Sequence, residues 1–323
     1  MRTVLAPLRR DTPSEPPQRG QHPLVLVACS GGADSLALAA ATAFVAPRCG
    51  IRGGLITVDH GLLPESAAQA ERVAALGAEL GLAPVEVVRV QVGRAGGPEA
   101  AARAARYTAL DAAAAASDAH LLLGHTLDDQ AETVLLGLGR GSGPRSIVGM
   151  AAVDGRYLRP FLRLRRATTA AACAALGLAP WCDPHNADPA FQRVQLRREV
   201  LPLLEDVLQG GVAEALARTA DLLRDDLAAL DGWAEHARIA ARRPPAGLDA
   251  GALIDLPRAV RTRVLRAWAR DRGAAPLSAE RTGALDALVV AWHGQGPVDL
   301  PGGVSVARTS GTLVAYSPPS PQE

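Results

Sequence analysis

The chain has 323 residues, of which 48% are hydrophobic and 21% charged, and its formal net charge at pH 7 is +1. This length is ample for two domains, and the composition is that of a globular protein rather than a disordered or fibrous one. A nearly balanced charge excludes a global field that would draw the chain onto nucleic acid, so an RNA partner would need a local basic patch.

Individual residue types exclude several further classes. All 34 basic residues are arginine, which excludes a Walker-type P-loop and a pyridoxal phosphate site because both need a lysine. The four cysteines contain no CxxC pair, which argues against a disulfide framework, a zinc knuckle and an iron–sulfur cluster. No stretch reaches the roughly 20 apolar residues of a membrane span, and the N-terminus lacks a signal-peptide pattern. We therefore expect a cytoplasmic protein without a membrane partner.

The first two thirds of the chain predict alternating strands and helices. Residues 1–22, rich in Pro, Arg, Gln and Ser, predict a disordered tail. Strands are then predicted at residues 24–29, 54–58, 85–90 and 120–124, and helices at 36–46, 65–80, 98–116 and 127–138. This alternation predicts an α/β fold with a doubly wound parallel sheet, in which ligands bind beyond the carboxyl ends of the strands.

The last third predicts a smaller second domain. A long amphipathic helix is expected at 212–236, two more at 256–272 and 278–293, and a β-like segment at 298–316. The pair Gly210-Gly211 is the predicted break. The expected organisation is a disordered tail (1–22), an α/β domain (23–209) and a mostly helical C-terminal domain (210–323).

The strongest motif follows the first predicted strand and precedes a helix. It reads Ser30-Gly31-Gly32-Ala33-Asp34-Ser35. Glycines permit a tight turn that presents N–H groups to phosphate oxygens, the serines add hydroxyl donors, and the helix N-terminus adds a partial positive charge. Because Asp34 would repel a phosphate directly, it is expected to coordinate Mg²⁺ or to orient the loop. An ordinary strand–turn–helix joint with a capping residue is the alternative interpretation.

A crowded acidic segment follows the fourth predicted strand. Thr126 is expected to cap the next helix, and the side chain of Asp129, three residues on, is expected to complete a capping box by bonding back to the Thr126 backbone. Asp128 and Glu132 share a helix face, where like charges are unfavourable without a cation or a basic partner. Bound Mg²⁺ or a basic substrate would relieve that repulsion.

Two weaker signals complete the set. Asp59-His60-Gly61 follows the second strand, although a histidine there is about as often structural as ligand-binding. Arg103 and Arg106 lie on the 98–116 helix and could pair with phosphates or simply form an exposed helix face.

Seven segments together carry a family resemblance. In chain order they are SGGADS (30–35), VDHGL (58–62), ARAARYTAL (102–110), GHTLDDQAET (124–133), RGSGP (140–144), RPFL (159–162) and WCDPHNAD (181–188). The chain closely resembles the tRNA(Ile)-lysidine synthetase family of the PP-loop ATP pyrophosphatase superfamily, whose fold is adenine nucleotide alpha hydrolase-like. The resemblance is dense from about residue 24 to 205. SGGxDS alone marks the wider superfamily.

The resemblance implies a two-step ligase reaction. ATP adenylates the C2 carbonyl oxygen of the wobble cytidine in the minor isoleucine tRNA with the CAU anticodon, and the ε-amine of L-lysine then displaces AMP to give lysidine, which allows AUA decoding. ATP would be bound by Ser30, Gly31, Gly32, Ala33, Asp34, Ser35, His60 and Gly61. Asp34, Asp128, Asp129 and Glu132 would form the catalytic set, with Asp34 and Asp129 as Mg²⁺ ligands.

Arginines supply the expected tRNA contacts. Arg103, Arg106, Arg193 and Arg197 are the predicted tRNA-binding residues, within a wider basic density that includes Arg156, Arg159, Arg163, Arg165, Arg166 and Arg198. The family pattern R-N-R-[IV]-R reads Arg193-Val194-Gln195-Leu196-Arg197 here, so the three inner positions differ while both outer arginines remain. The family pattern GHH reads Gly124-His125-Thr126. A homodimer is left open by the sequence.

Three alternatives remain at this level. A tRNA thiolase of the same fold adenylates a similar base but delivers sulfur, generally with paired cysteines or a cluster. An amidotransferase-coupled synthetase would need a glutaminase domain. An inert RNA-binding module would not explain the acidic segment, since carboxylates weaken RNA binding unless a cation is present.

Overall fold

The computed structural model describes residues 1–8, 22–61, 64–93, 97–141, 143–182, 188 and 190–316, and for residues 98–99 the backbone only. It divides into two compact units, residues 1–221 and 222–323. The division falls inside one helix, α9 (Val212–Ala240). The sequence predicts the boundary at Gly210-Gly211, directly before that helix, because a glycine pair is the nearest local signal for a break. None of the described helices is long and apolar enough to cross a membrane.

The first unit contains a six-stranded sheet with the order β3-β2-β1-β4-β6-β5. Its strands are β1 (Leu24–Ala28), β2 (Arg52–Asp59), β3 (Val85–Arg89), β4 (Ala119–Leu123), β5 (Val153–Asp154) and β6 (Tyr157–Leu158). All neighbouring pairs are parallel except β5–β6. The chain order reverses at β1, which pairs with β2 on one side and β4 on the other. This is the switch point at which a doubly wound sheet opens a crevice for ligands.

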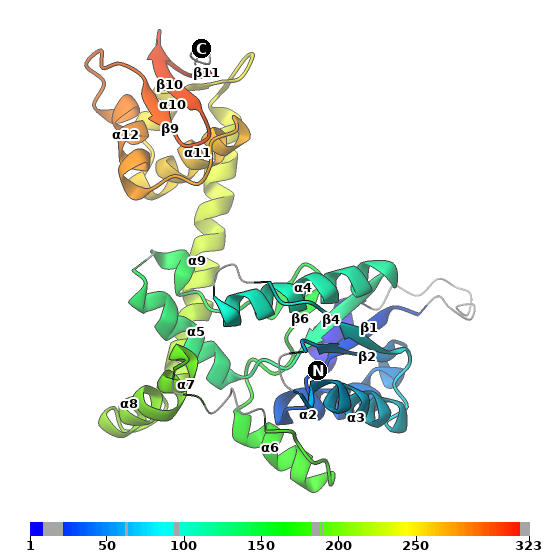
Figure 1. Ribbon diagram of the computed structural model, residues 1–323. Coiled ribbons are helices and arrows are strands. Elements are labelled where there is room, and N and C mark those ends of the chain that lie inside the picture. The colour runs from blue at the N-terminus through cyan, green and yellow to red at the C-terminus, as the bar shows by residue number, and fades with distance from the viewer. Residues whose placement is uncertain are drawn as a thin grey trace. The chain divides into compact units, whose positions relative to one another are not determined.

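Strand β1 is buried on both faces, as its continuous apolar run predicts. Val25 and Val27 pack into a core shared with helices α2, α3 and α6, whereas Leu24 and Leu26 pack into a second core with α4. Figure 1 shows α4 on one side of the sheet and α2 and α3 on the other. Because successive side chains of a strand point to opposite faces, one short strand supplies both cores.

The helices of this unit comprise the four predicted ones and several others. They are α1 (Arg2–Leu5), α2 (Ala33–Val45), α3 (Ser66–Glu79), α4 (Pro98–Ala116), α5 (Leu127–Gly139), α6 (Arg166–Ala175), α7 (Gln192–Gln195) and α8 (Leu201–Val207). A π-helical turn, η5 (Leu196–Val200), joins α7 to α8. The four predicted strands and the helices α2 to α5 are therefore confirmed, with ends that differ by a few residues.

The predicted disordered tail is wrong for residues 1–8. These residues form α1 and a short 3-10 turn, and Leu5 is fully buried in the core on the α2 side. Apolar side chains at Met1, Val4 and Leu8 pack against the same core, so this short segment gains more from burial than its polar neighbours suggest. Residues 9–21 of the predicted tail lie outside the described residues.

The second unit combines helices with an antiparallel sheet of order β7-β8-β11-β10-β9. Its further helices are α10 (Gly251–Ile254), α11 (Arg258–Asp271) and α12 (Ala279–Val290), and its strands are β7 (Arg242–Arg243), β8 (Gly247–Asp249), β9 (Val298–Leu300), β10 (Val304–Thr309) and β11 (Thr312–Tyr316). The two predicted helices and the β-like segment are confirmed. The short strands β7 and β8 carry too few residues to show a pattern in the sequence.

Candidate active site

The loop between β1 and α2 has the geometry of an anion site. Gly31 has φ +85°, a value that favours glycine, and Gly32 is the N-cap of α2. The Ser35 hydroxyl accepts a hydrogen bond from the backbone N of Ser30 at 3.2 Å and donates to the carbonyl of Gly32 at 2.9 Å. The loop is thus closed on itself, and the N–H groups of the first turn of α2 remain available to an anion.

Two close approaches fix this loop against its neighbours. A Cβ at Gly124, just after β4, would lie 3.1 Å from the backbone C and O of Asp34. A Cβ at Gly31 would lie 2.3 Å from the side-chain amide of Gln69 on α3. The backbone N of Trp181 donates to the carbonyl of Gly31 at 2.9 Å. The loops that follow β1 and β4 are therefore packed too tightly to accept a side chain at Gly31 or Gly124 without a shift.

The turn after β2 forms a second wall. The buried Asp59 accepts hydrogen bonds from the backbone N of Gly61 at 2.9 Å and from Arg89 at 3.2 Å. A hydrogen bond from Ser66, together with these contacts, holds the pKa of Asp59 below its ordinary value, although burial opposes them. The carboxylate thus stabilises its own turn, from which His60 faces the cleft.

The third loop leads into α5 and carries the acidic residues. Thr126 and Asp129 form a capping box, with the Thr126 backbone N donating to Asp129 Oδ2 at 2.8 Å and Thr126 Oγ1 accepting from the Asp129 backbone N at 3.4 Å. The predicted cap is therefore confirmed. This box points the second oxygen of Asp129 away from the helix end and toward the cleft, where it meets an arginine.

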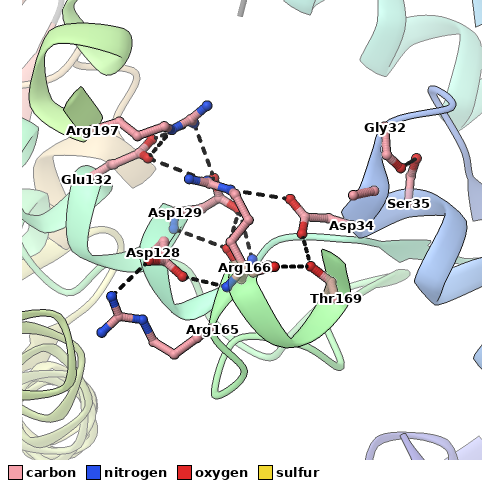
Figure 2. A network of polar contacts seen from close by, with 12 residues as sticks. Gly32, Asp34, Ser35, Asp128, Asp129, Glu132, Arg165, Arg166, Thr169 and Arg197 are labelled. Atoms are coloured by element: carbon pink, nitrogen blue, oxygen red, sulfur yellow. Dashed lines mark hydrogen bonds and ion pairs between the residues drawn. The ribbon is translucent and has the colours of Figure 1, made fainter. Parts of the chain in front are cut away.

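Arg166, the first residue of α6, lies at the centre of the carboxylates (Figure 2). Its Nη2 donates to Asp129 at 2.6 Å and lies 3.5 Å from Glu132, while its Nε lies 3.5 Å from Asp34. Its backbone N donates to Asp128 Oδ2 at 2.7 Å. The four predicted acidic residues are thus brought together around one residue.

Further arginines balance the same charges. Arg197 donates from Nε and Nη2 to both oxygens of the fully buried Glu132, at 2.8 and 3.2 Å. Arg193 lies 3.9 Å from Glu132, and Arg165 lies 3.2 Å from Asp128. A buried carboxylate without partners would cost several kcal/mol, so these arginines are needed for the acidic cluster to exist.

The two carboxylates nearest the loop differ in proton affinity. Burial raises the pKa of Asp34, although the hydrogen bond from Thr169 and the charge of Arg166 work against it. Burial also acts on Asp129, but Arg166 and the hydrogen bonds from Thr126 outweigh it and lower the pKa of Asp129. Asp129 is therefore the fixed anion of the pair, and Asp34 is the easier one to protonate.

His125 is a site residue that sequence reasoning did not select. Its Nδ1 is buried and has no hydrogen-bond partner among the described residues, and burial lowers its pKa to about 4. The imidazole is consequently neutral at pH 7. The family pattern at 124–126 was the available signal, but a histidine beside a strand end is too common to be assigned from sequence alone.

These elements enclose a cleft of about 660 Å³ at the carboxyl ends of the central strands. Of the predicted ATP-binding residues, Ser30, Gly32, Ala33, Asp34, Ser35 and His60 line it. Gly31 and Gly61 do not line it, and each acts through its backbone, with φ +85° and +62° respectively. Trp181 and Arg166 line the cleft as well, although the sequence indicated them only within a motif and a basic stretch.

The predicted tRNA-binding arginines occupy two places. Arg103 is exposed on α4 and contacts the Tyr107 hydroxyl at 3.3 Å, whereas Arg106 on the same helix lines the cleft. Arg193 and Arg197 come from the α7–η5 segment and reach Glu132. Of the predicted motifs, residues 183–187 of WCDPHNAD, Ser142 of RGSGP and Leu62 of VDHGL lie outside the described residues.

The acidic cluster suits only one kind of metal site. Within the described ranges, no group of three or more His, Cys, Asp and Glu side chains is arranged to hold a metal ion by itself. Asp34 and Asp129 still offer carboxylate oxygens beside the phosphate loop. Magnesium in nucleotide sites is usually held by one or two carboxylates together with phosphate oxygens and waters. The donor set therefore fits a magnesium ion that arrives with a nucleotide, and it does not fit a protein-only metal centre.

Comparisons with known proteins agree with this geometry. Residues 10–204 match a family model described as a PP-loop domain, and residues 248–314 match one described as a TilS substrate binding domain. The tRNA(Ile)-lysidine synthase of Thermobifida fusca is 56% identical over 317 residues, which are 97% of this chain and 96% of the relative. That of Streptomyces coelicolor is 57% identical over 309 residues, 94% of this chain and 88% of the relative.

A solved structure shares the fold at greater distance. It is the U34-tRNA thiolase NcsA from Methanococcus maripaludis with its [4Fe-4S] cluster, with a TM-score of 0.54 and 18% identity over 69% of this chain and 78% of that one. At that identity the likeness concerns the fold alone.

Proposed function

Since the chain belongs to the tRNA(Ile)-lysidine synthase family, we propose that its cleft uses ATP to join L-lysine to C2 of the wobble cytidine of the minor isoleucine tRNA. The observation that carries this proposal is the meeting of a phosphate-binding loop with the carboxylates of Asp34 and Asp129 in one cleft, with Asp128 and Glu132 held next to Asp129 by arginines. Adenylation needs the phosphate-binding loop, and capture of a cationic amine needs the carboxylates.

In the first step the loop at 30–35 binds the triphosphate. Backbone N–H groups at the N-terminus of α2 would face the phosphates and Ser30 would add a hydroxyl group, while the Ser35 hydroxyl holds the loop closed. The C2 carbonyl oxygen of the cytidine attacks the α-phosphate, and pyrophosphate leaves. Backbone dipoles fixed by the Ser35 hydrogen bonds stabilise the charge that develops without having to reorganise.

Magnesium would be held by Asp34 and Asp129 together with the phosphate oxygens, and when bound it would neutralise charge on the departing pyrophosphate. Both carboxylates lie within reach of the loop, and both now pair with Arg166. The chain's own contribution is to hold the carboxylates of Asp34 and Asp129 at the edge of the phosphate site.

In the second step the ε-amine of lysine attacks C2 and AMP leaves. We assign Asp129, which lines the cleft, to holding the lysine ammonium, with Asp128 and Glu132 supporting it from the same turn and a half of α5. The amine must lose a proton before it attacks. A carboxylate beside the amine can accept that proton.

For the tRNA itself we propose contacts from Arg103, Arg106, Arg193 and Arg197. Arg106 and Arg197 line the cleft, where they can meet phosphates on either side of the target cytidine. ATP, lysine and tRNA are all cytoplasmic, and we propose that location for the protein. The thiolase alternative receives no support beyond the shared fold, because the likeness to a thiolase is only 18% in sequence.

The direct test is incorporation of labelled lysine into the minor isoleucine tRNA. Asp34→Ala should lower incorporation by about a hundredfold or more, because it removes an oxygen from the edge of the phosphate site. The matched control is Glu71→Ala, which deletes an exposed carboxylate from α3 and should leave the rate unchanged. Near-normal incorporation by a folded Asp34→Ala enzyme would remove Asp34 from the mechanism. No lysine incorporation by the wild type would refute the proposed function.

A further inference from the structure

The guanidinium of Arg166 bridges the carboxylates on the two sides of the acidic site. The side chain of Arg166 contacts Asp129 at 2.6 Å, Glu132 at 3.5 Å and Asp34 at 3.5 Å, and Figure 2 shows it between the two sides of the cleft. Burial opposes its charge, but Asp129, Glu132 and Asp34 together raise the pKa of Arg166, so the group is cationic at every working pH. The carboxylates assigned to a substrate ammonium are therefore already occupied by a cation.

The backbone of Arg166 is fixed, while its side chain is not enclosed. Its backbone N donates to Asp128 at 2.7 Å, and its carbonyl lies 2.7 Å from the hydroxyl of Thr169, which also donates to Asp34. The side chain is 27% exposed and lines the cleft. Any adjustment at this point must consequently come from rotation of the arginine side chain about an anchored peptide.

An alternative partner for this guanidinium lies next to it. Asp34 belongs to the first turn of α2, whose N-terminus forms the phosphate loop, and Arg166 Nε is only 3.5 Å from its carboxylate. A triphosphate in the loop would place several anionic oxygens beside the same guanidinium. Arginine pairs with phosphate in the same bidentate manner as with carboxylate, so the exchange leaves its charge compensated.

We propose that Arg166 is a positioning residue that occupies the lysine site in the absence of ATP, and that a bound triphosphate draws its guanidinium away and opens that site. This inference rests on the proposed function and adds an order of binding to it. Lysine and Arg166 compete for Asp129, which lines the cleft, whereas Glu132 keeps its contacts with Arg197; ATP and lysine bind with positive coupling. The arrangement prevents the free enzyme from holding an amine before an adenylate can form.

The competing interpretation is a permanent structural ion pair. In that case Arg166 would only neutralise the carboxylates, and its removal would weaken lysine binding or leave it unchanged. If Arg166 instead blocks the site, its removal should strengthen lysine binding, because the carboxylate that it contacts is then open to lysine. Lysine affinity without ATP therefore distinguishes the two interpretations.

The experiment is a calorimetric titration of the full chain with L-lysine. It is run without nucleotide and with magnesium plus an ATP analogue that carries a methylene bridge between the α- and β-phosphates. For the wild type we expect lysine affinity to rise about tenfold or more when the analogue is present. Arg166→Gln should bind lysine without the analogue about as well as the wild type does with it. The control Arg163→Gln, an 89% exposed neighbour paired with Asp221, should behave like the wild type.

Each outcome has a defined consequence. Equal lysine affinity of the wild type with and without the analogue overturns the inference, and this arm does not depend on whether Arg166→Gln folds. The inference is also overturned if the analogue raises the lysine affinity of a folded Arg166→Gln variant as much as it raises that of the wild type. Absence of lysine binding in both states, with normal incorporation of lysine into tRNA, overturns the inference and leaves the proposed function intact. Absence of both binding and incorporation refutes the proposed function and the inference with it.

Discussion

At the scale of single residues, the site is a set of ionisable groups whose pKa values are shifted in different directions by their surroundings. Asp129 is held as an anion by Arg166 and Thr126, whereas burial makes Asp34 easier to protonate. His125 lies beside them as a neutral imidazole, because burial lowers its pKa to about 4. Titratable groups whose surroundings shift their pKa values apart are typical of sites that move protons.

The buried histidine gives a prediction about stability and pH. Its folded-state pKa of about 4 lies below the ordinary value of 6.5, so the unfolded chain binds the proton first. Stability from this group is fully present above about pH 6.5 and is lost as pH falls toward 4. The loss amounts to up to about 3 kcal/mol. His125→Gln should lose that part of the pH dependence in urea-unfolding titrations.

Other groups titrate in the same range, so the comparison needs a matched variant. His236→Gln, which removes an exposed histidine from α9, should keep the wild-type pH dependence. If His125→Gln and His236→Gln showed the same slope between pH 6.5 and 4, His125 would not be a buried neutral group.

Much of the residue set could be predicted, and the remainder depends on long-range contacts. The acidic residues were predictable because like charges on adjacent helix turns need a cation. The cation that meets them could not be predicted, because Arg166 lies 37 residues from Asp129 in sequence and reads as one arginine in a basic stretch. His125 and Trp181 show no periodicity or spacing that separates them from structural residues.

At the scale of elements, the site depends on how closely the strand ends approach each other. The loop after β4 passes so near the start of α2 that a Cβ at Gly124 would lie 3.1 Å from the Asp34 backbone. The π-helical turn η5 lies between α7 and α8 and carries Arg197, which reaches Glu132. Such turns are often found at functional sites, because they change the facing of the residues they carry.

The close approach can be tested by adding one methyl group. Gly124→Ala should push the Asp34–Ser35 backbone by a few tenths of an ångström and raise KM for ATP by roughly tenfold, since small misplacements in a site are costly. Gly139→Ala is the control: that glycine ends α5 and a Cβ there would meet nothing within 4 Å. Steady-state kinetics of both variants, with thermal melting to check folding, provide the measurement.

An unchanged KM for ATP in a folded Gly124→Ala enzyme would show that the β4 loop does not position the phosphate site. The strands β1 to β4 and the helices α2 to α5 were predictable, because short apolar runs such as β1 and β4 are followed by amphipathic helices. The π turn was not, because Val194 and Leu196 continue an ordinary helical pattern in the sequence.

At the scale of the whole molecule, the chain consists of an α/β unit that carries the cleft and a second unit with its own core and antiparallel sheet. The sequence predicts the first unit well, since its parallel sheet has strong local signals. In the second unit, the strands β7 and β8 are two and three residues long and could not be predicted locally. Helix α1 was missed because four residues next to a polar segment carry little helical signal by themselves.

The most direct test of the central claim is the mass of the wobble nucleoside in the minor isoleucine tRNA after incubation with the full chain, ATP and L-lysine. The chain contains no lysine, so lysine recovered from the digested tRNA cannot come from the enzyme's own side chains. We predict that the wobble cytidine gains one lysine only when ATP is present. An unmodified cytidine, or a sulfur-containing nucleoside in its place, would contradict the account.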